Sequence, residues 1–492
     1  MMSCFVVCAG VLAQAGAVFA KPSQPNIVFI LADDLGIRDL RCYGSALHAT
    51  PHIDELADAG LKFEQAYVAH PRCIPSRASL LTGTFPAVLG CPGGNQWRGG
   101  LGTDEVTLAE ALRTRGYATA VVGKWHLAGG GGQPTEGMMP TDQGFDHAVA
   151  ATSAGLPRSY FPPYDGPFEG PQSWRNQKDP IGLVAEHRDE YLTDRLTDEV
   201  CDFIEGHVEQ NPDQPFFVYL SHYAVHQPID AKHDATERYE ARLRAGPTYD
   251  GPDFLPRDGL TKARQDDAGY AAMVESVDDS VGQVVALLNR LDIADDTIVV
   301  FTSDNGGLSN RGPEYRRDIE TSNLPFRAGK GHLYEGGIRV PQIVSWLGMT
   351  PEGATSDAVT VNTDWFPTLL ELGGVSMSEA GVDERRVDGV SITSVLRGGS
   401  LDERPVIFWH SPRGRPGPTG DENSSAIRVG DWKLIDYYDQ DRQELFHMAA
   451  DPYEVFDLSE AHPERVEQLF DQLDAWRREI NAVGTWRRSQ GD

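Results

Sequence analysis

The sequence is poor in cysteine. Six of its 492 residues are cysteine, and two of these, Cys4 and Cys8, lie in an apolar segment at the N-terminus. Small secreted domains that depend on disulfides carry many more cysteines for their length. The composition therefore excludes a disulfide-stapled scaffold, and a chain this long can bury the core of one large domain and a smaller one.

Basic residues are also scarce. Lys and Arg total 43 against 73 Asp and Glu, which gives a formal net charge of −30 at pH 7. A nucleic-acid-binding surface needs a basic face, so this balance argues against a nucleic-acid partner. An anionic ligand can still bind, but only where local positive charge offsets the acidic surface.

Long apolar runs are absent after the first 20 residues. Residues 1–20 carry no charge and are apolar from Phe5 to Ala20, with Val18 and Ala20 at small-residue positions before Lys21. This pattern is typical of a secretory signal peptide and predicts a secreted or periplasmic protein with no membrane contact beyond that segment. Because the segment has no basic residue at its start, an uncleaved anchor is the alternative.

Hydrophobic patterning predicts an α/β fold. Unbroken apolar strands alternate with amphipathic helices, which is typical of a large, mostly parallel sheet covered by helices on both faces. From about residue 402 the pattern changes to short strands and a final helix that begins at Pro463. We therefore expect a main domain over residues 21–400 and a smaller α+β subdomain over residues 401–492.

Polar residues follow four predicted strands, at residues 26–32, 117–122, 215–220 and 297–301. In a parallel sheet, ligands bind beyond the carboxyl ends of the strands, so these residues predict one site, although each alone is more often a turn or capping residue. The strand-end residues are Asp33 and Asp34, Lys124 and His126, His222 and His226, and Asp304 and Asn305. The oxygen atoms of the Asp and Asn side chains suit Ca²⁺ or Mg²⁺.

Residues 73–83 read CIPSRASLLTG. We expect a helix whose first position is Pro75, which places Cys73 just before the helix and Arg77 one turn into it. Free backbone N–H groups and a nearby arginine would favour an anion there. A lone cysteine near a helix start is otherwise more often a small buried hydrophobe.

The whole stretch resembles the signature of the formylglycine-dependent sulfatases, of the alkaline phosphatase superfamily, and all fixed positions of Cys-x-Pro-Ser-Arg-x-x-x-Leu-Thr-Gly are present. The resemblance implies that a maturation enzyme oxidises Cys73 to formylglycine. The aldehyde hydrate would supply a nucleophile and a second hydroxyl that can expel sulfate. With Cys73 modified, the mature chain would retain Cys42, Cys91 and Cys201, which leaves one disulfide at most and does not settle whether it forms.

A second signature of the same family matches residues 116–126, GYATAVVGKWH. The resemblance implies a calcium site formed by Asp33, Asp34, Asp304 and Asn305 together with the modified Cys73. It further implies that Lys124 and Lys330 contact sulfate, that His126 is the base that releases it, and that His226 or Lys330 protonates the leaving oxygen. Val225 stands where the family usually has proline, and His222 competes with His226 as a substrate contact.

The resemblance implies a sulfuric ester hydrolase, and the length of the irregular loops favours a sulfated carbohydrate as substrate. Two alternatives stay open: a phosphate or phosphonate monoester hydrolase, and a glycan-binding protein without activity. Arginines gather in two loop-like stretches, at residues 311–327 and 413–415. The arginines of the first stretch are equally consistent with ion pairs on the surface. Arg413 and Arg415 have no acidic neighbour before Asp421. We therefore expect both at the mouth of the site, where they would bind carboxylates or further sulfates of the substrate.

Overall fold

A computed structural model describes residues 24–91, 100–129, 138–166, 179–401, 404, 406–437 and 439–482. The predicted signal peptide, with Cys4 and Cys8, lies outside these residues. Among the helices that the structure describes, none has the length and apolar character needed to cross a membrane.

An eight-stranded mixed sheet forms the centre of the molecule, in the order β12-β2-β11-β9-β1-β6-β4-β5. Only β11 runs antiparallel to its neighbours, so the predicted α/β class with a mostly parallel sheet is confirmed. The strands are β1 (Asn26–Ala32), β2 (Leu61–Phe63), β4 (Ala118–Gly123), β5 (His147–Val149), β6 (Phe216–Ser221), β9 (Thr297–Ser303), β11 (Gln342–Ser345) and β12 (Ala354–Ser356).

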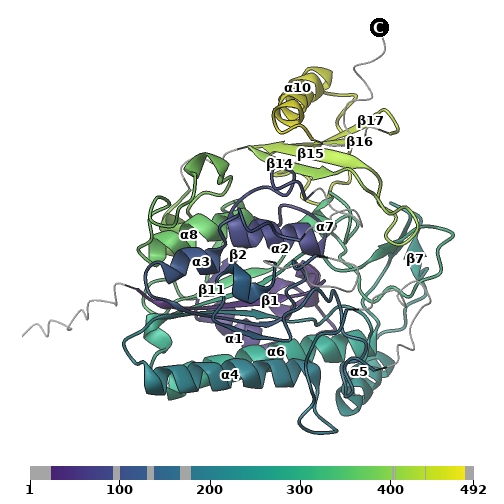
Figure 1. Cartoon of the computed structure of the whole chain (residues 1–492). Helices are drawn as coiled ribbons and strands as arrows, with labels where there is room; N and C mark the ends of the chain where they lie inside the picture. Colours follow the sequence, from purple (N-terminus) through teal and green to yellow (C-terminus); the bar gives the residue numbers. More distant parts are fainter. Residues whose placement is uncertain are drawn as a thin grey trace, which may run out of the picture.

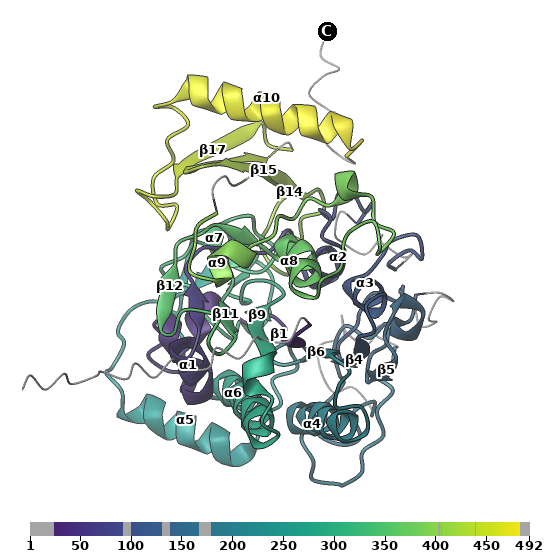
Figure 2. The same ribbon diagram turned by 90° about the vertical axis from the view of Figure 1, so that its left-hand side faces the viewer.

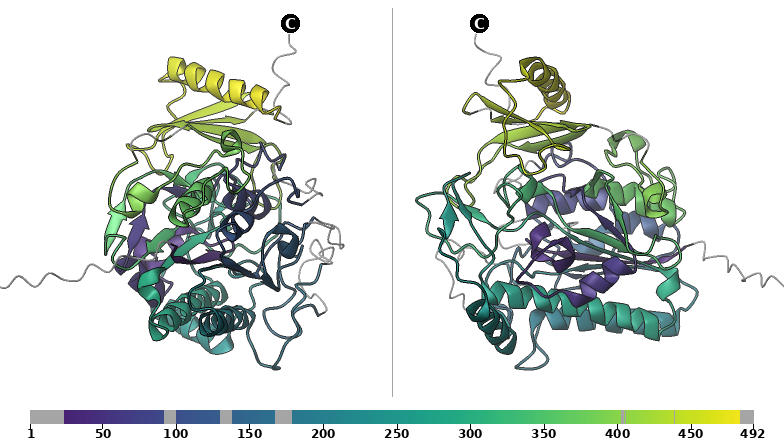
Figure 3. Two further views of the ribbon diagram at one scale, coloured as in Figure 1. Left: turned by 60° about the vertical axis from the view of Figure 1, so that its left-hand side comes forward. Right: turned by 180° about the vertical axis from the view of Figure 1, so that it is seen from behind.

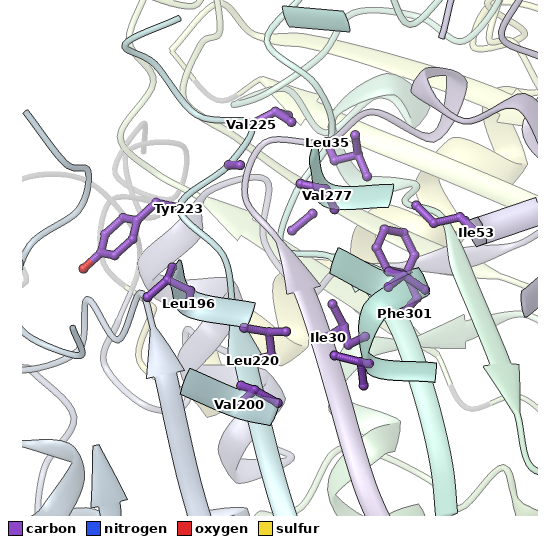
Figure 4. Packing of buried hydrophobic residues seen from close by; sticks show 14 of the residues in the cluster. Ile30, Leu35, Ile53, Leu196, Val200, Leu220, Tyr223, Val225, Val277 and Phe301 are labelled. Atoms are coloured by element: carbon purple, nitrogen blue, oxygen red, sulfur yellow. The ribbon is translucent and has the colours of Figure 1, made fainter. Parts of the chain in front are cut away.

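Helices cover both faces of this sheet (Figure 1). One face carries α1 (Pro51–Asp58), α4 (Leu192–Gln210), α5 (His233–Ala245) and α6 (Ala268–Arg290), and the other carries α2 (Cys73–Thr82), α3 (Leu108–Arg113) and α8 (Trp365–Leu372). Side chains of β1 alternate between the two cores: Val28 and Ile30 face the first, and Phe29 faces the second. In the first core, Leu196 and Val200 of α4 lie against Leu220 of β6 (Figure 4).

The C-terminal subdomain is a four-stranded antiparallel sheet with one helix on its outer side (Figure 2). Its elements are β14 (Ile407–Ser411), β15 (Ser424–Val429), β16 (Trp432–Tyr437), β17 (Arg442–His447) and α10 (Pro463–Glu479). The sheet stands at one end of the large domain in every view (Figure 3). The buried Lys433 of β16 joins the two parts, because its Nζ donates to Glu335 at 2.9 Å and to Glu454 at 2.8 Å.

Shorter elements complete the fold. The short strands and helices are β3 (Ala66–Tyr67), β7 (Phe254–Leu255), β8 (Leu260–Lys262), β10 (Asn310–Arg311), β13 (Thr360–Val361), α7 (Glu335–Ile338) and α9 (Thr393–Leu396). The 3₁₀ turns include residues Ile37–Asp39, Arg41–Tyr43, Pro140–Gln143, Ala294–Asp296, Asn362–Asp364 and Glu384–Arg386.

The structure answers two questions that the sequence raises: where α2 begins and whether a disulfide forms. Helix α2 begins at Cys73 with Arg72 as its N-cap, so the predicted start at Pro75 is wrong by two residues. Proline is tolerated throughout a first turn because none of its N–H groups has an acceptor within the helix. Cys42, Cys73 and Cys201 are free thiols, so no disulfide joins any two of the four cysteines that the structure describes.

Helix α1 is capped by a residue from α6. Its own N-cap, Thr50, makes no side-chain capping bond, and Asp278 instead accepts from the backbone N–H of His52 at 3.2 Å and of Ile53 at 2.7 Å. Burial raises the pKa of Asp278 to about 7, and these two hydrogen bonds only partly oppose the rise. The folded protein therefore holds a proton here at pH values where the unfolded chain has released it.

We expect this difference to make stability fall as pH rises from about 4 to 7, because the raised pKa favours the folded state only while Asp278 is protonated. The Asp278→Asn variant keeps an oxygen acceptor and cannot ionise. Its free energy of unfolding in urea should decline less between pH 5 and pH 8 than that of the unsubstituted chain. If the free energy of unfolding declined equally in the two proteins, Asp278 would not be the cause of the pH dependence.

Candidate active site

Four neighbouring strands bring the predicted polar residues to one edge of the large sheet. Asp33 and Asp34 follow β1, and Asp304 follows the adjacent β9, while the N-terminus of α2 supplies Cys73. One ligand atom from each of these four residues lies within 4.8 Å of the others, and all four are buried. The structure therefore brings together chain segments separated by up to 271 residues, as the strand-end pattern predicts.

Asn305 completes an oxygen-rich pocket around this cluster. Its Nδ2 donates to Asp34 Oδ1 at 2.8 Å, and its Oδ1 is buried without a hydrogen-bond partner. A buried amide oxygen beside three carboxylates is a donor set that suits a hard divalent cation such as Ca²⁺. The residues present thus fit the predicted calcium site.

Three buried cations offset the charge of these carboxylates. Lys330 donates from Nζ to both oxygens of Asp34, at 2.5 and 2.6 Å, and its Nζ lies 3.4 Å from Cys73 Sγ. Lys124 hydrogen-bonds to Asp33 through its Nζ. Although burial alone would raise the pKa of Asp34, the charge of Lys330 holds it below its usual range. Lys124, Lys330 and Arg77 therefore place three positive charges against the carboxylates around Cys73.

Arg77 is fully buried beneath the cluster. Its guanidinium donates to Asp304 Oδ2 at 2.9 Å from Nε and lies 2.8 Å from the same oxygen through Nη2. Its Nη1 donates to the carbonyl oxygen of Lys124 and to Ser221 Oγ. Burial and the nearby charge of Asp33 raise the pKa of Asp304 to about 6, while Arg77 opposes the rise. Ser221, at the end of β6, was not singled out in the sequence because a lone serine carries no signal.

The unmodified Cys73 thiol is a poor nucleophile in this setting. Only 6% of the residue is exposed, and burial raises its pKa to about 12, against the lowering effect of Lys124 and Lys330. The thiol therefore stays protonated at physiological pH, whereas a cysteine nucleophile acts as its thiolate. The geometry argues against direct thiolate chemistry at this position.

Two of the three predicted histidines lie at the cluster. His226 has its Nε2 3.6 Å from Asp34 Oδ2 and its Nδ1 2.8 Å from the Gln227 carbonyl oxygen. Burial lowers its pKa to about 3, against the opposing charge of Asp34. His126 is half-buried, with φ at +61°, and desolvation together with the charges of Lys124 and Arg77 lowers its pKa well below the usual value.

His222 lies elsewhere. Its ring is fully buried, and Nε2 is 3.0 Å from the Oγ of Ser280 on α6. Burial lowers its pKa to about 3. The expectation of a substrate contact at His222 finds no support in this geometry, because the side chain packs toward the helices that cover the sheet.

The predicted arginines of the C-terminal subdomain are partly exposed, and the backbone N–H of Arg415 donates to Asp421, the partner of Arg72. The charges of Arg72, Asp421 and Arg317 act on its guanidinium. Arg72 was missed in the sequence. It precedes Cys73, and its partner Asp421 lies 349 residues away, a separation that no local pattern reveals.

Comparison with known proteins gives a consistent picture. Residues 25–375 match the family model described as Sulfatase, and residues 328–479 match the one described as N-sulphoglucosamine sulphohydrolase, C-terminal. The chain is 31% identical over 504 residues to N-acetylgalactosamine-6-sulfatase of Sus scrofa, covering 93% of this chain and 86% of the relative. It is 30% identical over 542 residues to a sulfatase of Formosa agariphila, covering 95% and 91%.

Solved structures agree with these relatives. The crystal structure of Ps i-CgsB in complex with k-i-k-neocarrahexaose has a TM-score of 0.74 and 30% identity, covering 94% of each chain. A phosphonate monoester hydrolase of Agrobacterium radiobacter has a TM-score of 0.64 at 20% identity, which shows a shared fold alone.

Proposed function

This chain belongs to the sulfatase family, and from that premise we propose that it hydrolyses sulfate esters of carbohydrates with a formylglycine made from Cys73 and a bound Ca²⁺. The sulfuric ester hydrolase activity follows from the family. The observation that carries the finer proposal is the buried cluster of Asp33, Asp34, Cys73 and Asp304, surrounded by three cationic side chains.

We infer that the calcium ion and the formylglycine both belong to this cluster. Asp33, Asp34, Asp304 and Asn305 would hold the calcium ion beside residue 73. When bound, the metal would polarise a sulfate oxygen of the substrate, and the aldehyde hydrate would supply a pair of reactive hydroxyls. A maturation enzyme would have to convert Cys73 to the aldehyde. The proposal also includes the predicted secreted or periplasmic location.

The chain's own cations stabilise the transferring sulfate. Lys330 contacts Asp34, Lys124 contacts Asp33, and Arg77 contacts Asp304. Fixed, buried positive groups of this kind stabilise charge that develops during the reaction more than they would in water. We assign them to binding and orienting the sulfate oxygens.

The two histidines divide the proton transfers. Both have lowered pKa values and are neutral at physiological pH. His126 is the base that takes a proton from the hydroxyl remaining on residue 73 as sulfate leaves. The leaving alcohol oxygen receives its proton from the ammonium of Lys330, or from the Nε2 of His226 in its protonated form, which the neighbouring Asp34 favours.

Carbohydrate is the favoured substrate class. N-acetylgalactosamine-6-sulfatase is named for an amino sugar, and Ps i-CgsB was solved with k-i-k-neocarrahexaose. The test compares hydrolysis of 4-nitrophenyl sulfate, 4-nitrophenyl phosphate and a set of sulfated oligosaccharides. Sulfate turnover well above phosphate turnover is expected. Preference for the phosphate ester would support the rival monoesterase, and absence of turnover on every ester would support the rival glycan-binding protein.

A substitution at Gly155 tests the proposed catalytic role of His126. A Cβ built on Gly155 would lie 2.6 Å from both Cε1 and Nε2 of the His126 ring, too close for carbon and nitrogen atoms that are not bonded. We expect Gly155→Ala to displace the ring and to lower kcat by about 10- to 100-fold, with a smaller change in KM, because small displacements of a catalytic group are costly.

The matched control is Gly206→Ala on α4, where the nearest atom to the added Cβ is 3.9 Å away. Steady-state kinetics on 4-nitrophenyl sulfate, with melting curves to confirm folding, provide the measurement. A folded Gly155→Ala enzyme with unchanged kcat would show that the position of the His126 ring does not matter.

A further inference from the structure

The loop between β14 and β15 ties the C-terminal subdomain to the start of α2. The C-terminal sheet lies on the side of the large domain that carries α2 (Figure 1). In this loop, Asp421 accepts from Arg72 Nη2 at 2.8 and 2.7 Å, and the Thr419 hydroxyl oxygen accepts from the same nitrogen at 3.2 Å. Arg72 is 5% exposed and Asp421 2%. A buried ion pair from the other subdomain therefore holds the residue directly before Cys73.

The same ion pair packs against the turn that carries Lys330. Gly331, the next residue, has φ at +96°, and a Cβ built on it would lie 2.6 Å from Asp421 Oδ1 and 2.9 Å from Arg72 Nη2. A glycine therefore lets the backbone of the turn approach the pair this closely. The backbone N–H of Gly331 also donates to the Pro71 carbonyl oxygen at 2.9 Å. The turn and the start of α2 are thus joined at the ion pair.

The loop also contacts the turn through His332. This histidine is buried, and its Nε2 lies 2.9 Å from the Thr419 carbonyl oxygen. The Thr419 hydroxyl donates to Asp421, and the backbone N–H of Arg415 donates to Asp421 Oδ2 at 3.3 Å. These hydrogen bonds hold Asp421 within its own loop, so its carboxylate is a fixed point for both the turn and α2.

The two segments that meet at this carboxylate carry reacting groups of the proposed mechanism. Lys330 reaches from the turn to Asp34, and its Nζ lies 3.4 Å from Cys73 Sγ. Because a lysine side chain is long and flexible, the position of its Nζ depends on how firmly the backbone beneath it is held. A shift of α2 against the turn would change the distance between Lys330 Nζ and residue 73, and a displacement of about 1 Å can lower a rate by about 100-fold.

We propose that Asp421 is a positioning residue that holds Lys330 beside residue 73, in the geometry needed to protonate the leaving oxygen. It acts through Arg72 on one side and through Gly331 on the other. This inference rests on the proposed function, because it depends on the proton transfer assigned to Lys330. It makes the C-terminal subdomain a necessary part of the active site.

The test compares the hydrolysis of 4-nitrophenyl sulfate with that of phenyl sulfate, whose leaving oxygen is more basic and depends more on protonation. In the full chain, Asp421→Asn keeps an oxygen acceptor for Arg72 but removes the charge that orients its guanidinium. We expect kcat on phenyl sulfate to fall at least about tenfold further than kcat on 4-nitrophenyl sulfate, since a general acid contributes about 10²- to 10⁴-fold. KM should change little on either ester.

Two substitutions of Thr419 give a second, milder test that does not depend on the folding of Asp421→Asn. Thr419→Val keeps the shape of the side chain and removes the hydroxyl that contacts both Arg72 and Asp421. Thr419→Ser keeps that hydroxyl. We expect the valine variant to show the same selective loss on phenyl sulfate to a smaller degree, and the serine variant to retain the ratio of the unsubstituted enzyme.

Asp436→Asn is the matched control, because it weakens another buried ion pair of the C-terminal subdomain, the one with Arg477 at 2.8 Å. It should lower the melting temperature without changing the ratio of the two kcat values. Three results would overturn the inference: an unchanged ratio in folded Asp421→Asn, equal ratios in the two Thr419 variants, or the same change of ratio in Asp436→Asn. Hydrolysis of 4-nitrophenyl sulfate by the unsubstituted chain tests the proposed function separately, so the two failures can be told apart.

Discussion

Replacing Cys73 with serine should abolish multiple turnover while leaving the fold intact. A serine oxygen at this position retains the contacts with Asp33 and Lys330 that the sulfur makes at 3.5 and 3.4 Å. It could accept sulfate once, but it lacks a second hydroxyl to release the group. We expect kcat on 4-nitrophenyl sulfate to fall by a factor on the order of 10³ to 10⁶, the scale of losses when a nucleophile is removed.

Cys91→Ser is the matched control. Cys91 is also buried, but it is not part of the cluster at the sheet edge. Its replacement should leave kcat close to that of the unsubstituted enzyme. Rapid-mixing experiments on Cys73→Ser should show at most one equivalent of released nitrophenol per site. Sustained turnover at the normal rate would rule out the aldehyde mechanism.

Replacing Asp304 with asparagine should remove both activity and stabilisation by calcium. The asparagine oxygen can still accept from Arg77, but the charge that would hold the metal is lost. A ligand at a hundredfold excess over its Kd stabilises the folded state by about 2.7 kcal/mol, so the unsubstituted chain should melt higher in Ca²⁺ than in a chelator. In Asp304→Asn this increment should vanish, and kcat/KM should fall at least about a hundredfold.

The control for that experiment is Asp39→Asn. Asp39 is another buried carboxylate near the same sheet edge, but it accepts from the Gly36 N–H and the Tyr270 hydroxyl and is not in the metal cluster. It should lower stability in both conditions and keep the calcium increment. An unchanged increment in Asp304→Asn would remove that residue from the ligand set.

The sequence predicted the strand-end residues because each of them follows an unbroken apolar run, which is a strong local signal. The run Asn26–Ala32 matches β1 in full, since a strand buried on both faces must be apolar throughout. The same signal places Asp33, Asp34 and Asp304 at one edge. The start of α2 was misplaced because proline is acceptable at any first-turn position.

Other parts of the site depend on contacts that sequence patterns do not encode. His222 and His226 follow the same strand, and only the packing of α6 directs His222 toward Ser280 while His226 lies beside Asp34. The sequence of strand β17, RQELFH, gives no strand signal of its own because it lacks a clear apolar alternation. The pairing of Arg72 with Asp421 depends on how the C-terminal subdomain sits on the large domain.

Mass spectrometry of the peptide that contains Cys73 tests the central claim most directly. Trypsin cleaves after Arg72 and Arg77, which releases residues 73–77 as one peptide. In protein that hydrolyses aryl sulfate, this peptide should be about 18 Da lighter than its cysteine form, because an aldehyde oxygen replaces the thiol. Active protein in which this peptide is entirely unmodified cysteine would contradict the account.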